Sequence, residues 1–293
     1  MASKCKIALL GYGAVGRFFA NQILSNPIYG DKFEIAFIWN RSFEVFSEEP
    51  EDIRQLAIDA ESVLAATKNF IQKKLGGIDL FVEVAHPEII KTHGTALLRI
   101  ANLYVASVTA FADERTLTNC LHEAKSNNHT IFLPSGAAWG VHDVLKMNEA
   151  GSLTKLEISM QFHADALRLV GPTSLLLDSY IQNASDQKPL LIAQGSIEEI
   201  AKIAPNNVNT MTCLRVAASS LSDEKVHGIL MAQKTTDAHL IDIKVQGMNG
   251  FFVHTHRHNP AKKSAVTGEE TFRSFLQSLI LATETTDRSV VFI

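Results

Sequence analysis

The stretch Ile7-Ala8-Leu9-Leu10-Gly11-Tyr12-Gly13-Ala14-Val15-Gly16 decides the fold of the first part of the chain. A short apolar run leads directly into a G-x-G-x-x-G loop, and residues with helical spacing follow from Val15 to about Leu24. In this context the first glycine allows a tight turn, the second lets a pyrophosphate approach the backbone, and the third lets the helix pack on the strand. The predicted dinucleotide contacts are Gly11, Gly13, Ala14, Val15 and Gly16.

Strand-like and helix-like segments continue to alternate after this loop, which is typical of a parallel sheet covered by helices. The expected strands are 6–10, 33–39, 78–85, 103–108 and 130–133. The expected helices are 15–24, 62–75, 87–103 and 113–125. The sequence therefore predicts an α/β fold with a Rossmann-type doubly wound parallel sheet.

The end of the second expected strand, Ile38-Trp39-Asn40-Arg41, lacks the acid that usually holds the ribose hydroxyls of NAD. Asn40 can bond a hydroxyl, and Arg41 can meet a 2′-phosphate, which favours NADP or use of both cofactors. A solvated loop residue is an equal interpretation of Arg41. Ala85 and His86 follow the third long strand, where the cofactor crevice should open. An ordinary loop histidine is the alternative for His86.

The pattern changes after about residue 150. Apolar and polar residues alternate from Leu153 to His163, and similar runs follow at 227–232, 239–245 and 251–256. Such alternation is typical of half-buried antiparallel strands. We expect a dinucleotide-binding domain over 1–137, completed by a returning segment 259–293 that begins with a turn at Asn259-Pro260 and holds a helix over 266–281. A second α+β domain with a mostly antiparallel sheet spans 138–258 and provides the substrate, catalytic and dimerisation surfaces.

Composition excludes several classes of function. The net charge of −4 gives no electrostatic reason to expect nucleic acid or an anionic membrane as a partner. Three widely spaced cysteines favour neither a disulfide framework nor a structural zinc site. We expect a cytoplasmic protein with no metal site and no membrane partner.

Several unusual blocks resemble the L-aspartate dehydrogenase family, and most closely its animal members. They occur in the family's order over nearly the whole chain, which makes them more specific than the glycine loop. The blocks are Thr109-Ala-Phe-Ala-Asp-Glu114, Leu133-Pro-Ser-Gly-Ala137, Gln194-Gly-Ser-Ile-Glu-Glu199, Ala204-Pro-Asn-Asn-Val-Asn209, Asp237-Ala-His239, Phe252-Val-His-Thr-His-Arg-His-Asn-Pro260 and Ala265-Val-Thr-Gly268.

The resemblance implies an NAD- or NADP-dependent oxidoreductase, usually a homodimer, that converts L-aspartate to iminoaspartate and then to oxaloacetate and ammonia. It places the catalytic histidine at His239 and the nicotinamide-side contacts at Ala137 or Ala138 and at Asn207. The chain departs from the microbial pattern at Asp237, where the family has Asn. An acid there could orient or charge the imidazole differently.

The chemistry of deamination sets separate demands on the residues. A base must take a proton from the substrate ammonium, and histidine suits this task near neutral pH. The chain has 11 histidines, so composition alone cannot identify the base, and His239 could equally be a surface residue at the end of a strand. The resemblance to the family favours a catalytic role for it. For the substrate carboxylates, Arg168 offers a planar fork, with a surface ion pair as the alternative. Ser135 is a further candidate at the tip of a strand, and His163 and Lys263 are weaker ones.

Three alternatives stay open. His254, His256 and His258 would share one strand face and could form a metal site, although the expected chemistry needs none. The protein could also be a dehydrogenase for another small amino or hydroxy acid, or a dinucleotide-binding sensor without catalysis.

Overall fold

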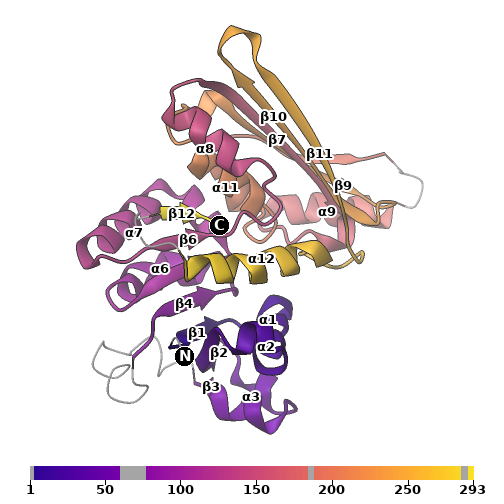
Figure 1. The fold of residues 1–293 in the computed structure, drawn as a ribbon. Helices are drawn as coiled ribbons and strands as arrows, with labels where there is room; N and C mark the ends of the chain where they lie inside the picture. The colour runs from indigo at the N-terminus through magenta and orange to yellow at the C-terminus, as the bar shows by residue number, and fades with distance from the viewer. Residues whose placement is uncertain (1–2, 60–76, 184–187, 285–289) are drawn as a thin grey trace. The chain divides into compact units, whose positions relative to one another are not determined.

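The computed structural model describes residues 3–59, 77–183, 188–284 and 290–293 and divides them into two compact units (Figure 1). The first unit comprises 1–110, 114–134 and 275–293, and the second comprises 111–113 and 135–274. The helix expected over Ser62–Leu75 lies outside the described residues. None of the helices in the described part of the chain has the length and apolar character needed to cross a bilayer.

The first unit contains a seven-stranded sheet in the order β12-β6-β5-β4-β1-β2-β3, with every pair parallel. The Rossmann-type parallel sheet is therefore confirmed. Its strands are β1 (Cys5–Leu10), β2 (Phe33–Trp39), β3 (Ala57–Ile58), β4 (Leu80–Glu83), β5 (Asn102–Val105), β6 (Ile131–Leu133) and β12 (Val290–Phe292).

Helices cover this sheet because its strands are apolar on both faces. On one face, Phe19 and Ile23 of α1 (Ala14–Ser25) share a core cluster with Leu276 and Leu279 from the last helix. Helices α6 (Pro87–Leu98) and α7 (Glu114–Asn127) pack against each other. The described part of the unit also holds the short segments α2 (Pro27–Gly30), η1 (Phe43–Phe46) and α3 (Glu51–Leu56).

The strand order reverses beside β1, because the chain builds β2 and β3 on one side of it and β4 to β6 on the other. In sheets of this kind ligands bind beyond the carboxyl ends of the strands at such a reversal. The loop after β1 and the segment after β4 meet there, since Val84 N donates to Leu10 O at 2.9 Å. The topology therefore brings Gly11 and Ala85 to one place in this unit.

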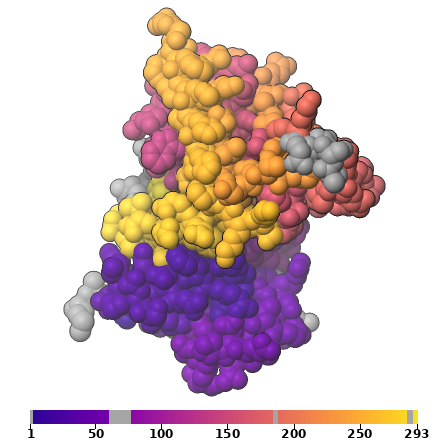
Figure 2. Space-filling view, turned by 90° about the vertical axis from the view of Figure 1, so that its right-hand side faces the viewer, coloured from indigo at the N-terminus to yellow at the C-terminus, as the bar shows by residue number. Residues whose placement is uncertain are grey.

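The second unit is a five-stranded sheet in the order β11-β10-β7-β9-β8, antiparallel except for the β7–β9 pair. The mostly antiparallel second sheet is thus confirmed. The strands are β7 (Leu153–His163), β8 (Leu190–Gly195), β9 (Val226–Gln233), β10 (Ala238–Gly247) and β11 (Phe252–Pro260). Helices α8 (Val141–Glu149), α10 (Ile197–Ile203) and α11 (Asn209–Ala217) pack on one face, and α9 (Pro172–Gln182) packs against β8. Figure 2 shows the gold β10–β11 hairpin at the surface of this unit.

Two expectations about the C-terminal part are wrong. Asn259-Pro260 is not a turn, because it ends β11 and pairs with His239 and Ala238 of β10. Proline is tolerated at the end of an edge strand, where its missing N–H costs no ladder bond. The last helix, α12, spans Glu269–Ala282 and starts three residues later than its apolar pattern predicts. The buried Gly268 precedes it, packed so closely on Asn259 that a Cβ there would lie 2.4 Å from Asn259 Nδ2.

Candidate functional site

The glycine loop of the first unit has the shape that a pyrophosphate requires. Gly11 has φ +118°, a region that favours glycine, and a Cβ there would lie 2.8 Å from Ala85 Cβ. A Cβ on Gly16 would lie 2.1 Å from Gly11 O, whereas one on Gly13 would meet nothing within 4 Å. Helix α1 starts with no side-chain cap and no acid in its first turn. Its free N–H groups and the open space at Gly13 therefore fit a dinucleotide phosphate.

The residues after β2 brace this loop. Asn40 Oδ1 accepts from Tyr12 N at 3.0 Å, and its Nδ2 donates to Ser42 O at 3.0 Å. Arg41 is exposed and forms no ion pair with a described residue, so its guanidinium is free to meet a phosphate. Tyr12 donates its hydroxyl to Glu49, which also pairs with Arg17.

Glu83 is a buried carboxyl that the sequence reasoning missed. It ends β4 with no exposed surface, and it accepts four hydrogen bonds. Oε1 accepts from Ala85 N at 2.7 Å, His86 N at 2.9 Å and Ser107 Oγ at 2.9 Å, and Oε2 accepts from Ser107 N at 3.1 Å. Burial raises the pKa of Glu83 to about 7, against the opposing effect of these bonds. The carboxyl ties the segment after β4 to the segment after β5 at the crevice edge.

His86 begins α6 as its N-cap. Its Nδ1 accepts from Glu88 N at 3.1 Å, which leaves Nε2 to carry the proton of the neutral ring. Partial burial lowers the pKa of His86. The neighbouring Ala85 lies against Gly11, so this predicted crevice residue sits beside the glycine loop in the same unit.

His239, the expected catalytic residue, lies near the start of β10 with 5% of its surface exposed. Its Nε2 lies 2.9 Å from the carbonyl oxygen of Ala265, and its ring packs 4.6 Å from that of Phe162. Because a carbonyl oxygen only accepts, Nε2 carries the proton and Nδ1 keeps the basic lone pair. Burial lowers the pKa of His239, with the Ala265 bond opposing it. The neutral tautomer with a basic Nδ1 is the one that suits a general base.

Arg168 and Asn207 belong to the same unit and are joined directly. Asn207 Oδ1 accepts from Arg168 N at 2.8 Å, and Asn207 Nδ2 donates to Ala166 O at 3.1 Å. The Arg168 guanidinium donates to three main-chain carbonyls, those of Asp165, Leu167 and Ser264. The carbonyls of Ser264 and Ala265 thus connect one loop to both Arg168 and His239.

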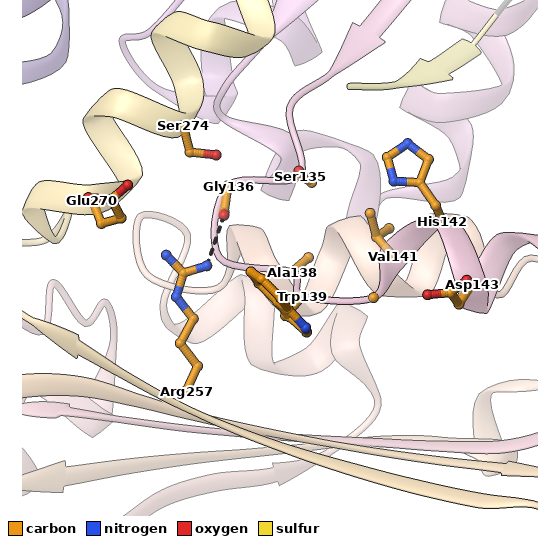
Figure 3. A pocket seen from close by; sticks show the side chains of 11 residues that line it. Ser135, Gly136, Ala138, Trp139, Val141, His142, Asp143, Arg257, Glu270 and Ser274 are labelled. Carbon is orange, nitrogen blue, oxygen red and sulfur yellow. Dashed lines mark hydrogen bonds between the residues drawn. The ribbon is translucent and has the colours of Figure 1, made fainter.

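A pocket of about 440 Å³ lies beside the segment that follows β6 (Figure 3). Ser135, Gly136 and Ala138 line it, and Arg257 extends toward it from β11. Arg257 Nη1 donates to Gly136 O at 3.1 Å. The adjoining Ala137 is buried at 8% exposed. The structure thus places an unpredicted arginine next to the predicted Ser135 and Ala138.

The acid at 237 does not contact the imidazole of His239. The Asp237 side chain is 94% exposed, and its Oδ1 lies 3.9 Å from His258 Nε2. On the other face of the strand, Asp242 Oδ1 contacts His254 Nε2 at 2.7 Å and His256 Nδ1 at 3.1 Å. Within the described ranges no group of three or more His, Cys, Asp or Glu side chains has the arrangement of a metal site.

Two family models match successive parts of this chain. The aspartate dehydrogenase C-terminal model matches residues 143–278, and the homoserine dehydrogenase NAD-binding model matches residues 11–134. The chain is similar to an aspartate dehydrogenase domain-containing protein of Danio rerio, at 35% identity over 96% of both chains. It is also similar to an L-aspartate dehydrogenase of Methanococcoides burtonii, at 26% identity over 89% of this chain and 91% of that one.

Solved structures show the same fold. The aspartate dehydrogenase of Thermotoga maritima matches with a TM-score of 0.66 at 18% identity, over 99% of this chain and 100% of that one. A scyllo-inositol dehydrogenase of Lactobacillus casei, solved with NAD(H), matches with a TM-score of 0.54 at 10% identity over 96% and 88% of the two chains. The chain therefore shares the fold of these proteins, and its residues 11–134 form an NAD(P)-binding domain. The chain belongs to the aspartate dehydrogenase family.

Proposed function

We propose that this protein catalyses the NAD(P)-dependent oxidative deamination of L-aspartate. In this proposal the first unit holds the dinucleotide and the second unit supplies the substrate and catalytic groups. The observation that carries it is His239: a buried imidazole in a fixed tautomer, within a chain of the aspartate dehydrogenase family. Such a base near neutral pH is what removal of a proton from an ammonium group requires.

The reaction needs one acceptor for a hydride and one for a proton. The bound nicotinamide supplies the chemistry of accepting the hydride from Cα of L-aspartate. In the proposal, Nδ1 of His239 takes the ammonium proton, and loss of both forms the carbon–nitrogen double bond of iminoaspartate. Water then adds to that bond, and ammonia leaves to give oxaloacetate. Ser135 and Arg168 are proposed as groups that hold substrate.

The dinucleotide would lie on the glycine loop, at Gly11, Gly13, Ala14, Val15 and Gly16, with its adenosine end near Asn40 and Arg41. Ala85 and His86, and in the second unit Ala137, Ala138 and Asn207, complete the proposed contacts. No carboxylate stands at the end of β2, and Arg41 is free to meet a 2′-phosphate. We expect NADP to be used at least as well as NAD.

A homodimer is part of the proposal. The β10–β11 hairpin of the second unit leaves Phe251, Phe252 and Val253 exposed, at 49%, 55% and 39%. Large apolar side chains grouped on a surface often mark a protein contact. Light scattering on the purified protein should give twice the chain mass, and Phe252→Ser should shift the protein toward the monomer.

The activity is tested by mixing purified protein with NAD⁺ or NADP⁺ and following the absorbance of the reduced nicotinamide. L-Aspartate should reduce the cofactor, whereas L-glutamate and L-alanine should not. Reduction by a different amino or hydroxy acid would replace L-aspartate as the substrate. Tight dinucleotide binding with no reduction by any acid would reject the enzyme in favour of a sensor.

A further inference from the structure

Arg257 has the placement of a ligand-binding cation. It extends from β11 toward the pocket beside Gly136 (Figure 3). The side chain is half-buried, and among the described residues only Gly136 O receives one of its hydrogen bonds. A guanidinium has five N–H donors, so most of this fork is available to a ligand.

The strand register puts Arg257 on the same face of the sheet as His239. His239 is paired with Asn259, and Ile241 is paired with Arg257. Directly paired residues of antiparallel strands point to one face, and residues two apart on a strand do so as well. Arg257 therefore lies one diagonal step from His239, both within the second unit.

The charge around the pocket favours an anion at Arg257. The two carboxylates on the rim belong to Glu270 and Asp143, which are 62% and 80% exposed. Each has its own cation, since Glu270 lies 3.0 Å from Arg273 and Asp143 lies 3.7 Å from Lys146. Burial lowers the pKa of the Arg257 guanidinium, with Glu270 opposing it. A cation that has lost solvent and lacks a paired carboxylate gains most from an incoming one.

We propose that Arg257 binds a carboxylate of a small dicarboxylate ligand in this pocket, with the Ser135–Ala138 segment forming the opposite wall. The inference rests on the proposed function, because it identifies which cation receives the substrate. It assigns to Arg257 the role that sequence reasoning gave to Arg168, whose guanidinium already donates to three main-chain carbonyls. The pocket's 440 Å³ is ample for a four-carbon dicarboxylate.

Titration calorimetry with succinate tests this directly, because succinate carries both carboxylates and cannot be deaminated. It should be run on the full chain with and without NADP⁺. Arg257→Gln should weaken succinate binding by roughly 10- to 100-fold, the effect of losing a charge-assisted pair. Arg257→Lys keeps the charge but not the planar fork, so its affinity for succinate should lie between those of the wild type and Arg257→Gln.

The matched control is Arg215→Gln, an arginine of the same unit that pairs with Asp223 away from the pocket. Thermal melting should be used to check that each variant folds. The inference is overturned if wild type binds no succinate in either condition. It is also overturned if Arg257→Gln and Arg257→Lys bind succinate as the wild type does, or if Arg257→Gln weakens NADP⁺ instead. Succinate binding that depends on Arg257 in a protein that never oxidises L-aspartate would uphold this inference and reject the proposed reaction.

Discussion

The environment of His239 makes a sharp prediction about one nitrogen atom. Nε2 is bound to Ala265 O, so the proposed base is Nδ1. His239→Gln keeps a side-chain donor for the Ala265 carbonyl but has no basic nitrogen. We expect kcat to fall by about 10²- to 10⁴-fold in both His239→Gln and His239→Ala, the usual contribution of a general base. Fluorescence titration should show unchanged NADPH affinity. Normal turnover in either variant would remove His239 from the mechanism.

Glu83 makes a prediction about stability and pH. Its pKa is raised from 4.5 to about 7 in the folded protein, so the folded state holds a proton that the unfolded state has already released. The free energy of unfolding should therefore fall as pH rises from about 4.5 to 7, by at most about 1.4 kcal/mol per pH unit for this one proton, and level off above. Glu83→Gln should remove this part of the pH dependence.

Urea unfolding of both proteins across this pH range measures the effect as a difference. Taking this difference removes the contribution of ionisable groups that lie away from Glu83. The free energy of unfolding of the wild type minus that of Glu83→Gln should fall as pH rises toward 7, and a rise of this signed difference with pH would contradict the raised pKa. Equal slopes would contradict it too.

At the scale of elements, two glycines of the same loop have different roles: Gly16 is needed for folding, and Gly13 for the proposed binding of the dinucleotide. A Cβ at Gly16 would collide with Gly11 O, whereas one at Gly13 would meet open space. Gly16→Ala should destabilise the protein by roughly 1–3 kcal/mol, because backbone must move. Gly13→Ala should keep the melting temperature and weaken NADPH binding by about 10-fold or more, because the methyl group occupies the space proposed for the pyrophosphate. If Gly13→Ala and wild type bound NADPH equally well, the pyrophosphate could not lie at Gly13.

The pattern of apolar and polar residues along the chain predicted the strands whose burial follows directly from that pattern. The run Phe33–Trp39 and the alternation Leu153–His163 match β2 and β7 residue for residue, because burial on two faces or one leaves a direct trace in sequence. The turn predicted at Asn259-Pro260 was wrong, because pairing with β10 outweighs the turn preference of that dipeptide. Strand β8 was missed, since the edge run Leu190–Gly195 lacks regular alternation.

At the scale of the whole molecule, the class of both sheets followed from sequence, but parts of the site did not. Glu83 ends an apolar run, and only the fold reveals that four donors from two loops surround it. Arg257 stands among alternating histidines, and its partner Gly136 is 121 residues away. Contacts over such separations depend on strand order and register, which no local pattern encodes. The one available signal was an ionisable residue at the end of a buried strand.

In the proposed reaction a hydride passes from Cα of L-aspartate to the nicotinamide. This transfer is tested most directly with L-aspartate carrying deuterium at Cα, followed by mass spectrometry of the reduced cofactor. Each molecule of NADPH or NADH formed should carry one deuterium, at C4 of the nicotinamide. Reduced cofactor without deuterium, or no reduction of either cofactor by a protein that binds both, would contradict it.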